Sequence, residues 1–260
     1  MRQSSHRTSY HLPVIPRLDR GISLKKGSAQ AGNVFVIILL GVFLFGSLMY
    51  MFSRNAQQGT GNLTKQQASI AAQEILNYAR LVEGAVDRVR RNGCSETEIS
   101  FANDVVPGYE HTPPARDECK VFDDAGGKVS WENEQQSWIS DPLLSGHPLF
   151  GEIFISGKSR IPRVGSTCIC NGNANEINLY FPWLKKEVCT ELNKLTNVDN
   201  PSGNPPVDPD GFIMSTQKFD GDFISNNTVD GIDGQTSACV QKATGFAPNS
   251  YIFVHVLLAR

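Results

Sequence analysis

The chain has 260 residues, the length of one or two domains, and 40% of them are apolar and 19% charged. With 23 Gly and 14 Pro, this composition indicates a loop-rich protein with a packed core and argues against wholesale disorder. A net charge of −2 gives no reason to expect nucleic acid as a partner. The charge is divided unevenly, since residues 1–54 contain seven basic residues and one acidic residue, whereas residues 55–260 contain 17 basic and 25 acidic residues.

Residues 1–32 are predicted to form a disordered, basic cytoplasmic leader. The first 24 residues have the periodicity of neither a helix nor a strand. Within them, His11–Ile22 (HLPVIPRLDRGI) resembles a peptide encoded by an interspersed repeat of some bacterial genomes. This resemblance implies an alternative translation start near Leu24, if that codon initiates. Whether the stretch is a disordered leader or a peptide encoded by a repeat, it is left out of the prediction of the fold.

An unbroken apolar run extends from Asn33 to Ser53 (NVFVIILLGVFLFGSLMYMFS), and no charged residue lies between Lys26 and Arg54. About 20 apolar residues in a helix cross the ~30 Å hydrocarbon core of a bilayer. The alternative is a cleaved secretory signal, whose apolar region would be about 7–15 residues long and would end in small residues. The run here is longer and ends in Met-Phe-Ser-Arg, which is a poor cleavage site. Residues 33–53 are therefore predicted to be a transmembrane helix.

The orientation of this helix follows from the basic residues that precede it. By the positive-inside rule, the N-terminus lies in the cytoplasm and residues 55–260 lie outside it. In a bacterium with two membranes, this compartment is the periplasm. The sequence thus predicts a single-pass protein of the bacterial inner membrane, with the lipid bilayer as its first partner.

A linker over residues 54–62 is expected to lead into one extracytoplasmic α+β domain over residues 63–260. Thr64 and Gln67 have the spacing of a capping box, in which each side chain bonds to the backbone N–H of the other residue. Apolar residues then recur at steps of three and four from Ala71 to Val89, and Asn92 and Gly93 end the pattern. This spacing predicts an amphipathic helix of about 28 residues that packs on a sheet.

Short strands separated by turns are predicted for the rest of the domain. Residues 119–122 and 128–131 flank a Gly-containing turn and have the pattern of a hairpin. Residues 152–156 and 176–181 are further strands, and the apolar run 251–258 is expected to be a buried closing strand. The predicted fold is a long helix packed on a small antiparallel sheet.

A second helix is expected to begin at Pro182, since Pro is favoured at the first helical position. Its apolar side would contain Leu184, Val188, Leu192 and Leu195.

Six cysteines follow the predicted span, and their even number in an oxidising compartment indicates disulfides. They are Cys94, Cys119, Cys168, Cys170, Cys189 and Cys239. A Cys94–Cys119 bond would tie the end of the helix to the next segment and would contribute ~3 kcal/mol. The other four are expected to pair among themselves, with Cys168 and Cys170 taking different partners. A metal site at Cys168 and Cys170 is the alternative, but one intervening residue is not the spacing of zinc sites.

The sequence has no pattern that indicates catalysis. His111, His147 and His255 lie among turns or on an apolar strand, where a structural role is the commoner one. There is no H-E-x-x-H, no G-x-S-x-G and no phosphate-binding glycine loop. We therefore expect no enzyme, no catalytic residue and no bound cofactor; an anchored enzyme would need titratable groups that converge in a cleft.

Acidic residues beside turn glycines leave two interpretations open for the stretch 199–237. Asp208, Asp210, Asp220 and Asp222 cluster oxygen ligands of the kind that Ca²⁺ prefers. None of them fits the EF-hand pattern, and solvated Asx and Gly turns explain the same composition. The four aspartates are thus candidate calcium ligands, and solvated turns are the alternative.

The order of elements resembles that of the type IV pilin and pseudopilin family. The resemblance covers about Lys25 to Gly93: a basic leader, a Gly, an apolar helix and then a long amphipathic helix leading into a disulfide-bearing domain. It implies that a prepilin peptidase cuts after Gly32, so that Asn33 becomes the mature N-terminus; Gly27 is a second candidate. The fifth mature position is Ile37, where most members have Glu and some minor, tip-located members do not.

This resemblance implies a non-enzymatic, pilin-like or pseudopilin-like component of a secretion or pilus filament. Its partners would be other pilin-like subunits and the peptidase. The alternative is a permanently membrane-anchored periplasmic domain that binds or scaffolds an unidentified partner.

Overall fold

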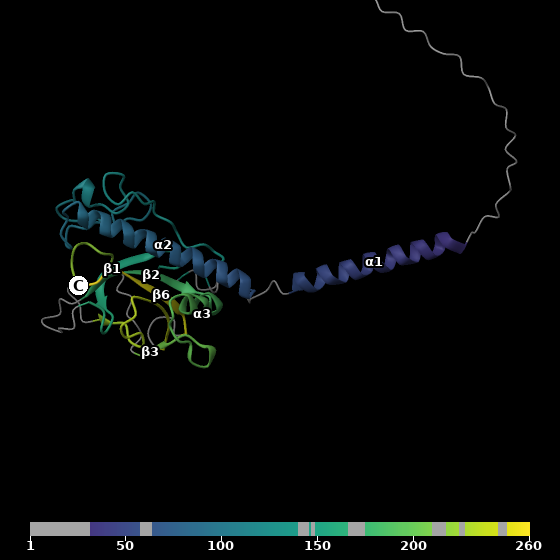
Figure 1. Cartoon of the computed structure of the whole chain (residues 1–260). Helices are drawn as coiled ribbons and strands as arrows, with labels where there is room; N and C mark the ends of the chain where they lie inside the picture. The colour runs from purple at the N-terminus through teal and green to yellow at the C-terminus, as the bar shows by residue number, and fades with distance from the viewer. Residues whose placement is uncertain are drawn as a thin grey trace, which may run out of the picture. The chain divides into compact units, whose positions relative to one another are not determined.

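The computed structural model describes residues 32–57, 64–139, 146, 149–165, 175–209, 217–223, 227–243 and 249–260 (Figure 1). The chain divides into two compact units, Met1–Gln58 and Gly59–Arg260. In the first unit, helix α1 covers Gly32–Gln57. The side chains described in α1, at positions 35–47 and 49, are all exposed, including Phe35 at 67% and Phe43 at 78%. The predicted span 33–53 lies within α1, and several of its side chains are outside the described residues.

When only the described residues are considered, no helix has the length and apolarity needed to cross a membrane.

The second unit begins with helix α2 (Lys65–Arg91), which confirms the predicted amphipathic helix. Thr64 N–H donates to Oε1 of Gln67 at 3.1 Å, and Gln67 N–H donates to Oγ1 of Thr64 at 3.3 Å, so the capping box is present. The buried side of α2 consists of Ala68, Ala71, Ala72, Ile75, Leu76, Tyr78, Ala79, Val82, Ala85, Val86 and Val89. The alanines on this side leave room for the helix to lie close to the sheet.

Six strands form one sheet in the order β3-β5-β6-β2-β1-β4. In chain order they are β1 (Phe154–Arg160), β2 (Glu176–Leu184), β3 (Val207–Asp208), β4 (Asn227–Thr228), β5 (Ser237–Lys242) and β6 (Tyr251–Leu258). The predicted α+β class is confirmed. The sheet is mixed, however, because β3 pairs with β5 and β4 pairs with β1 in parallel, while the four central strands are antiparallel. A long stretch of chain separates each short edge strand from its parallel partner, as the crossover between two parallel strands requires.

Successive residues of the central strands belong to two different hydrophobic clusters, as expected for side chains that alternate between the faces of a sheet. Leu179, Phe181 and Phe253 join the buried side of α2 in one cluster. Tyr180 and Val254 belong to the other cluster. α2 lies across the face of the sheet that carries the first of these clusters. Helix α3 (Lys186–Leu195) contacts both α2 and β5 (Figure 1). The short helices η1 (Asp117–Cys119) and η4 (Pro201–Gly203) lie in the connecting loops.

The predicted hairpin over residues 119–131 is wrong. Cys119 ends η1, Lys120 forms a single parallel bridge with Ser100, and the following residues form turns. A side chain of α2 explains the difference, because the Arg88 guanidinium donates to the carbonyl oxygen of Gly127. The loop is thus bonded to the helix rather than to a second strand.

The predicted helix start at Pro182 is also wrong, because β2 continues through Pro182 to Leu184. The register with β6 shifts between Phe181 and Leu184, and Trp183 has φ +63°. A bulge of this kind accommodates Pro within a sheet, since Pro has no N–H to donate. Helix α3 starts only at Lys186; its Val188 and Leu192 are buried, as predicted for the apolar side, whereas Leu195 is 42% exposed.

At Cys239, on the outer edge of β5, the backbone N–H and C=O are hydrogen-bonded by a side chain rather than by a neighbouring strand. Asn193 of α3 is fully buried, and its Nδ2 donates to the carbonyl oxygen of Cys239 at 2.9 Å. Its Oδ1 accepts from Cys239 N–H at 2.7 Å. The amide therefore supplies the donor and the acceptor that a neighbouring strand would supply, and this protects the edge of the sheet.

Replacing this amide tests its role. Asn193→Ala leaves the N–H and C=O of Cys239 buried without these partners, and we expect the free energy of unfolding to fall by about 2 kcal/mol. Urea unfolding followed by circular dichroism measures the change. Lys194→Ala, at the neighbouring exposed position on α3, should change stability by less than about 0.5 kcal/mol. Equal effects of the two substitutions would contradict the assignment.

Candidate functional site

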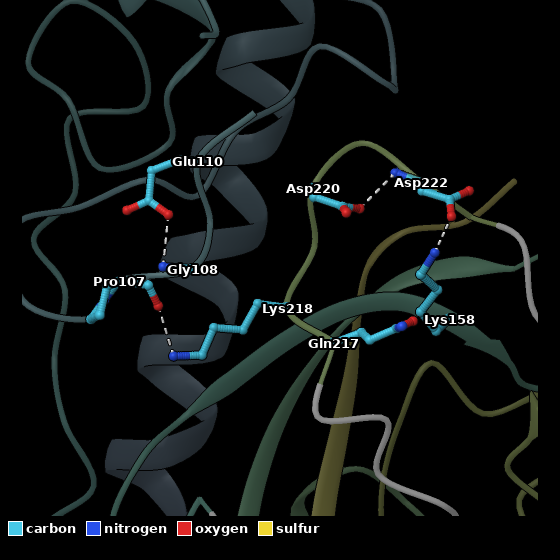
Figure 2. A pocket seen from close by; sticks show the side chains of 8 residues that line it. All are labelled: Pro107, Gly108, Glu110, Lys158, Gln217, Lys218, Asp220 and Asp222. Atoms are coloured by element: carbon cyan, nitrogen blue, oxygen red, sulfur yellow. Dashed lines mark hydrogen bonds and ion pairs between the residues drawn. The ribbon is translucent and has the colours of Figure 1, made fainter. Parts of the chain in front are cut away.

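Two depressions that share Asp220 and Asp222 form a polar groove in the described part of the domain. The first has a volume of about 780 Å³ and the second about 530 Å³. The first is lined by Pro107, Gly108, Glu110, Lys158, Gln217, Lys218, Asp220 and Asp222 (Figure 2). The second lies between residues 97–98, 111–116 and 220–222 and reaches Cys119. The groove thus joins three loop segments at the β1 side of the sheet.

Lys158 comes from a strand and Cys119 from η1, whereas the other groove residues come from loops. The β1–β2 register shifts between Ser156 and Ser159, and such a bulge redirects the side chain within it. The Lys158 side chain is only 7% exposed, and its ammonium pairs with Oδ2 of Asp222. A buried charge is costly unless it is paired, so this ion pair holds the 217–223 loop against β1. Gly157 beside it has no space for a side chain, since a Cβ there would lie 2.8 Å from the Phe219 ring.

Two carboxylates of the groove accept hydrogen bonds from backbone N–H groups. Oε2 of Glu110 accepts from Gly108 N–H at 2.7 Å, and Oδ1 of Asp220 accepts from Asp222 N–H at 3.2 Å (Figure 2). Lys218 lies in the same depression, where its Nζ donates to the Pro107 carbonyl oxygen at 2.9 Å (Figure 2). The exposed carboxylates of Glu110 and Asp220 are the groups of the groove that suit a basic group on a ligand.

His111 lines the second depression. Its pKa is lowered by burial, which the charge of Asp220 opposes. Within the described residues its Nε2 is buried without a hydrogen-bond partner. Gly221 lies against the ring with φ +93°, and a Cβ at this position would lie 2.7 Å from the Thr97 carbonyl oxygen. The loop can therefore make this turn only with glycine.

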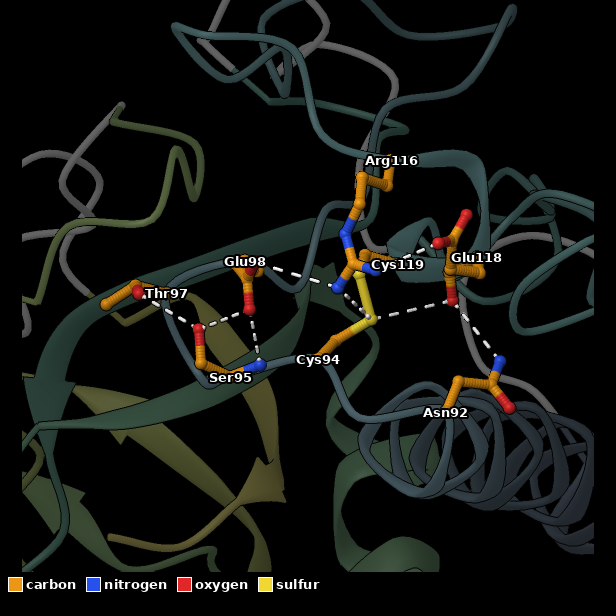
Figure 3. Close-up of a disulfide and its surroundings, with 8 residues drawn as sticks. All are labelled: Asn92, Cys94, Ser95, Thr97, Glu98, Arg116, Glu118 and Cys119. Atoms are coloured by element: carbon orange, nitrogen blue, oxygen red, sulfur yellow. Dashed lines mark hydrogen bonds and ion pairs between the residues drawn. A yellow bond between two sulfur atoms is a disulfide. The ribbon is translucent and has the colours of Figure 1, made fainter.

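The Cys94–Cys119 disulfide, which the sequence favoured, lies just beyond the end of α2 (Figure 3). The Arg116 guanidinium donates to Oε1 of Glu118 at 2.9 Å and lies 3.7 Å from Oε1 of Glu98. Nη2 of Arg116 also lies 4.0 Å from Sγ of Cys94, but two carboxylates already neutralise this cation, so the surroundings give little support to a cysteine thiolate. The bond is therefore best interpreted as structural.

The second disulfide joins Cys189 of α3 to Cys239 of β5. Every cysteine in the described part of the chain is in a disulfide. This pairing is incompatible with the prediction that Cys168 and Cys170 take different partners among the last four cysteines, because two of the four bond to each other. Cys168 and Cys170 lie outside the described residues. The two bonds indicate that the domain resides in an oxidising, extracytoplasmic compartment.

Of the four predicted calcium ligands, the structure brings Asp220 and Asp222 together in the groove and places Asp208 elsewhere. Asp208 is fully buried on β3, opposite Lys242 of β5, whereas Asp222 pairs with Lys158 in the groove. Asp210 lies outside the described residues. In the residues that the structure describes, no three His, Cys, Asp or Glu side chains are close enough to hold a metal ion.

The three candidate histidines are dispersed. His111 lies in the groove, His147 is outside the described residues, and His255 lies on β6, where it contacts Glu83 and Ser237. Sequence reasoning missed Lys158, whose only signal was a Lys after Gly in an apolar strand. Of the predicted processing residues, Gly32 and Asn33 lie at the start of α1, and Gly27 is outside the described residues.

Comparison of the chain with protein-family models, with curated proteins and with solved structures gave no match.

Proposed function

We propose that this chain is a pilin-like or pseudopilin-like component of a secretion or pilus filament, anchored in the bacterial inner membrane by residues 33–53. The observation that carries the proposal is the order of its elements. An apolar helix is followed, after a short linker, by a capped amphipathic helix packed on a disulfide-bearing sheet. In this role the apolar helix anchors and assembles the subunit, and the periplasmic domain offers a contact surface.

The membrane segment is proposed from the sequence. The run from Asn33 to Ser53 contains no charged residue, and the apolar side chains described in α1 are exposed on all sides of the helix. A helix of a water-soluble domain normally has a polar side, so exposure of apolar groups on every side favours lipid or neighbouring apolar helices as its surroundings.

The second candidate is a permanently anchored periplasmic domain that binds or scaffolds another protein. Ile37 in place of the usual Glu favours this candidate, and so does the acidic groove around Glu110 and Asp220. In this case the leader stays attached, and the groove is the binding surface.

N-terminal processing distinguishes the two. We expect the protein purified from its own membranes to begin at Asn33 or Ser28, as shown by intact mass and N-terminal sequencing. Gly32→Leu combined with Gly27→Leu should abolish processing and leave membrane insertion unchanged. A native protein that retains Lys25 and Lys26 would exclude prepilin processing and favour the anchored domain.

A further inference from the structure

Away from the groove, three side chains from three elements form one hydrogen-bonded chain. Oγ of Ser237, at the start of β5, lies 2.6 Å from Nδ1 of His255 on β6. Nε2 of the same imidazole lies 3.0 Å from Oε2 of Glu83 on α2. A hydroxyl, an imidazole and a carboxylate are thus connected in sequence between the helix and the sheet.

The carboxylate determines how protons are arranged in this chain. The hydrogen bond from His255 is the main cause that lowers the pKa of Glu83, so Glu83 is ionised at neutral pH. An ionised carboxylate only accepts hydrogen bonds, so the imidazole in its neutral form presents Nε2–H to Glu83. Nδ1 is then the acceptor, and the Ser237 hydroxyl donates to it. This is the protonation state in which an imidazole removes a proton from a serine.

Burial holds the imidazole in place and leaves the two ends of the chain accessible. His255 is 4% exposed, and its ring stacks on Phe253 with ring centroids 6.4 Å apart. The Glu83 side chain is 45% exposed, and Ser237 is partly exposed. The residue that carries the hydroxyl is thus partly open to solvent, while the imidazole is held in place by burial.

The strand register directs the Ser237 backbone N–H to the outer edge of β5. Val256 N–H donates to the Thr236 carbonyl oxygen, so the adjoining Ser237–His255 pair is one without mutual backbone bonds. Two residues along β5, the N–H of Cys239 points to the same edge, where it meets Asn193. Ser237 thus has a backbone donor on the side away from β6, a suitable group to stabilise a developing oxyanion.

We propose that Ser237 is a nucleophilic serine that reacts with carboxylic esters, with His255 as its general base and Glu83 as the residue that positions the imidazole. An activity of this kind goes beyond the proposed function, because neither filament assembly nor anchoring requires a nucleophile. In this assignment the Ser237 hydroxyl donates its hydrogen bond to Nδ1 of His255, the imidazole nitrogen that can take up the proton.

The reaction balances without a cofactor. Oγ of Ser237 forms a bond to the acyl carbon as its proton passes to Nδ1 of His255. The bond between the acyl carbon and the alcohol oxygen breaks, and the alcohol leaves with that proton. Water then attacks the acyl-serine in the same way, releases the acid and returns the proton to Ser237. Ester and water are consumed, and acid and alcohol are produced.

A fluorophosphonate probe tests the nucleophile on the full-length protein in detergent. Oγ of Ser237 would displace fluoride from phosphorus, and peptide mass spectrometry would locate the adduct. We expect one adduct, at Ser237, forming at least about 100-fold faster than on any serine without an imidazole base. Ser95 is the matched control, since its hydroxyl donates directly to Oε2 of Glu98 at 2.7 Å with no imidazole between them.

Variants separate a reactive serine from a structural one. Ser237→Ala should abolish labelling, and Ser95→Ala should leave it unchanged. Glu83→Gln should slow labelling about 100-fold at unchanged melting temperature, because the Gln amide can donate to Nε2 and so favour the imidazole with its proton on Nδ1. No adduct at Ser237 on the folded protein would overturn the proposal. Labelling of Glu83→Gln at the native rate would overturn the role of Glu83 and of the imidazole it positions.

Discussion

Removing the Cys189–Cys239 disulfide with the double substitution Cys189→Ala/Cys239→Ala is expected to lower the free energy of unfolding by about 4 kcal/mol. The two cysteines are 50 residues apart and both are fully buried. The cross-link restricts the unfolded chain, and in the folded protein it holds α3 where Asn193 reaches the edge of β5. Urea unfolding under non-reducing conditions measures the loss.

The second disulfide provides the comparison. Cys94→Ala/Cys119→Ala opens a shorter loop, with a separation of 25 residues, and should cost less. It should also leave the contacts of α3 with the sheet intact. If the Cys189→Ala/Cys239→Ala variant has the same urea midpoint of unfolding as the native protein, the stabilising role that we assign to this bond is wrong.

Glu176→Gln is expected to stabilise the protein at alkaline pH by about 3 kcal/mol and to have little effect near pH 4. Glu176 is 1% exposed at the start of β2, and burial raises its pKa from 4.5 to about 7. The hydrogen bond that Oε2 accepts from Ile161 N–H at 2.9 Å opposes this shift only in part.

The sign follows from proton binding. Between about pH 4.5 and pH 7 the folded state holds a proton that the unfolded state has released, so stability falls as pH rises through this window and is constant above it. Gln keeps an acceptor for Ile161 N–H and carries no charge, so it removes this fall. Unfolding measured from pH 4 to pH 8 gives the comparison, with Glu132→Gln on an exposed loop as control. Parallel curves for the native protein and Glu176→Gln would show that the Glu176 carboxyl does not titrate abnormally.

The elements that sequence reasoning placed correctly are those determined by short-range interactions. The capping box at Thr64 and the apolar spacing up to Val89 lie within one continuous segment, and α2 begins and ends where they predict. The run 251–258 contains apolar and β-branched residues on both sides, and it is β6, paired on both edges with β2 and β5. The Cys94–Cys119 bond closes a short loop directly after a predicted helix.

The failures occur where a distant group overrides the local pattern. The segment 119–131 has the composition of a hairpin, but Arg88 of α2 bonds to its turn. Pro182 fits a helix start, but pairing with β6 extends the strand past it through a bulge. The ion pair of Asp222 with Lys158 was likewise not predicted, because Lys158 is about 60 residues earlier in the chain and becomes its partner only when the 217–223 loop packs on β1.

The sequence by itself determined the class of fold, the long capped helix, the last strand, one disulfide and the apolar segment 33–53, because each depends on residues close together in the chain. The tertiary structure decided the mixed sheet, the Cys189–Cys239 bond, the closure of the β5 edge by Asn193 and the groove. It also decided the chain from Glu83 through His255 to Ser237, whose members lie on α2, β6 and β5. No local pattern signals that these three side chains meet, because strand register and the packing of α2 on the sheet bring them together.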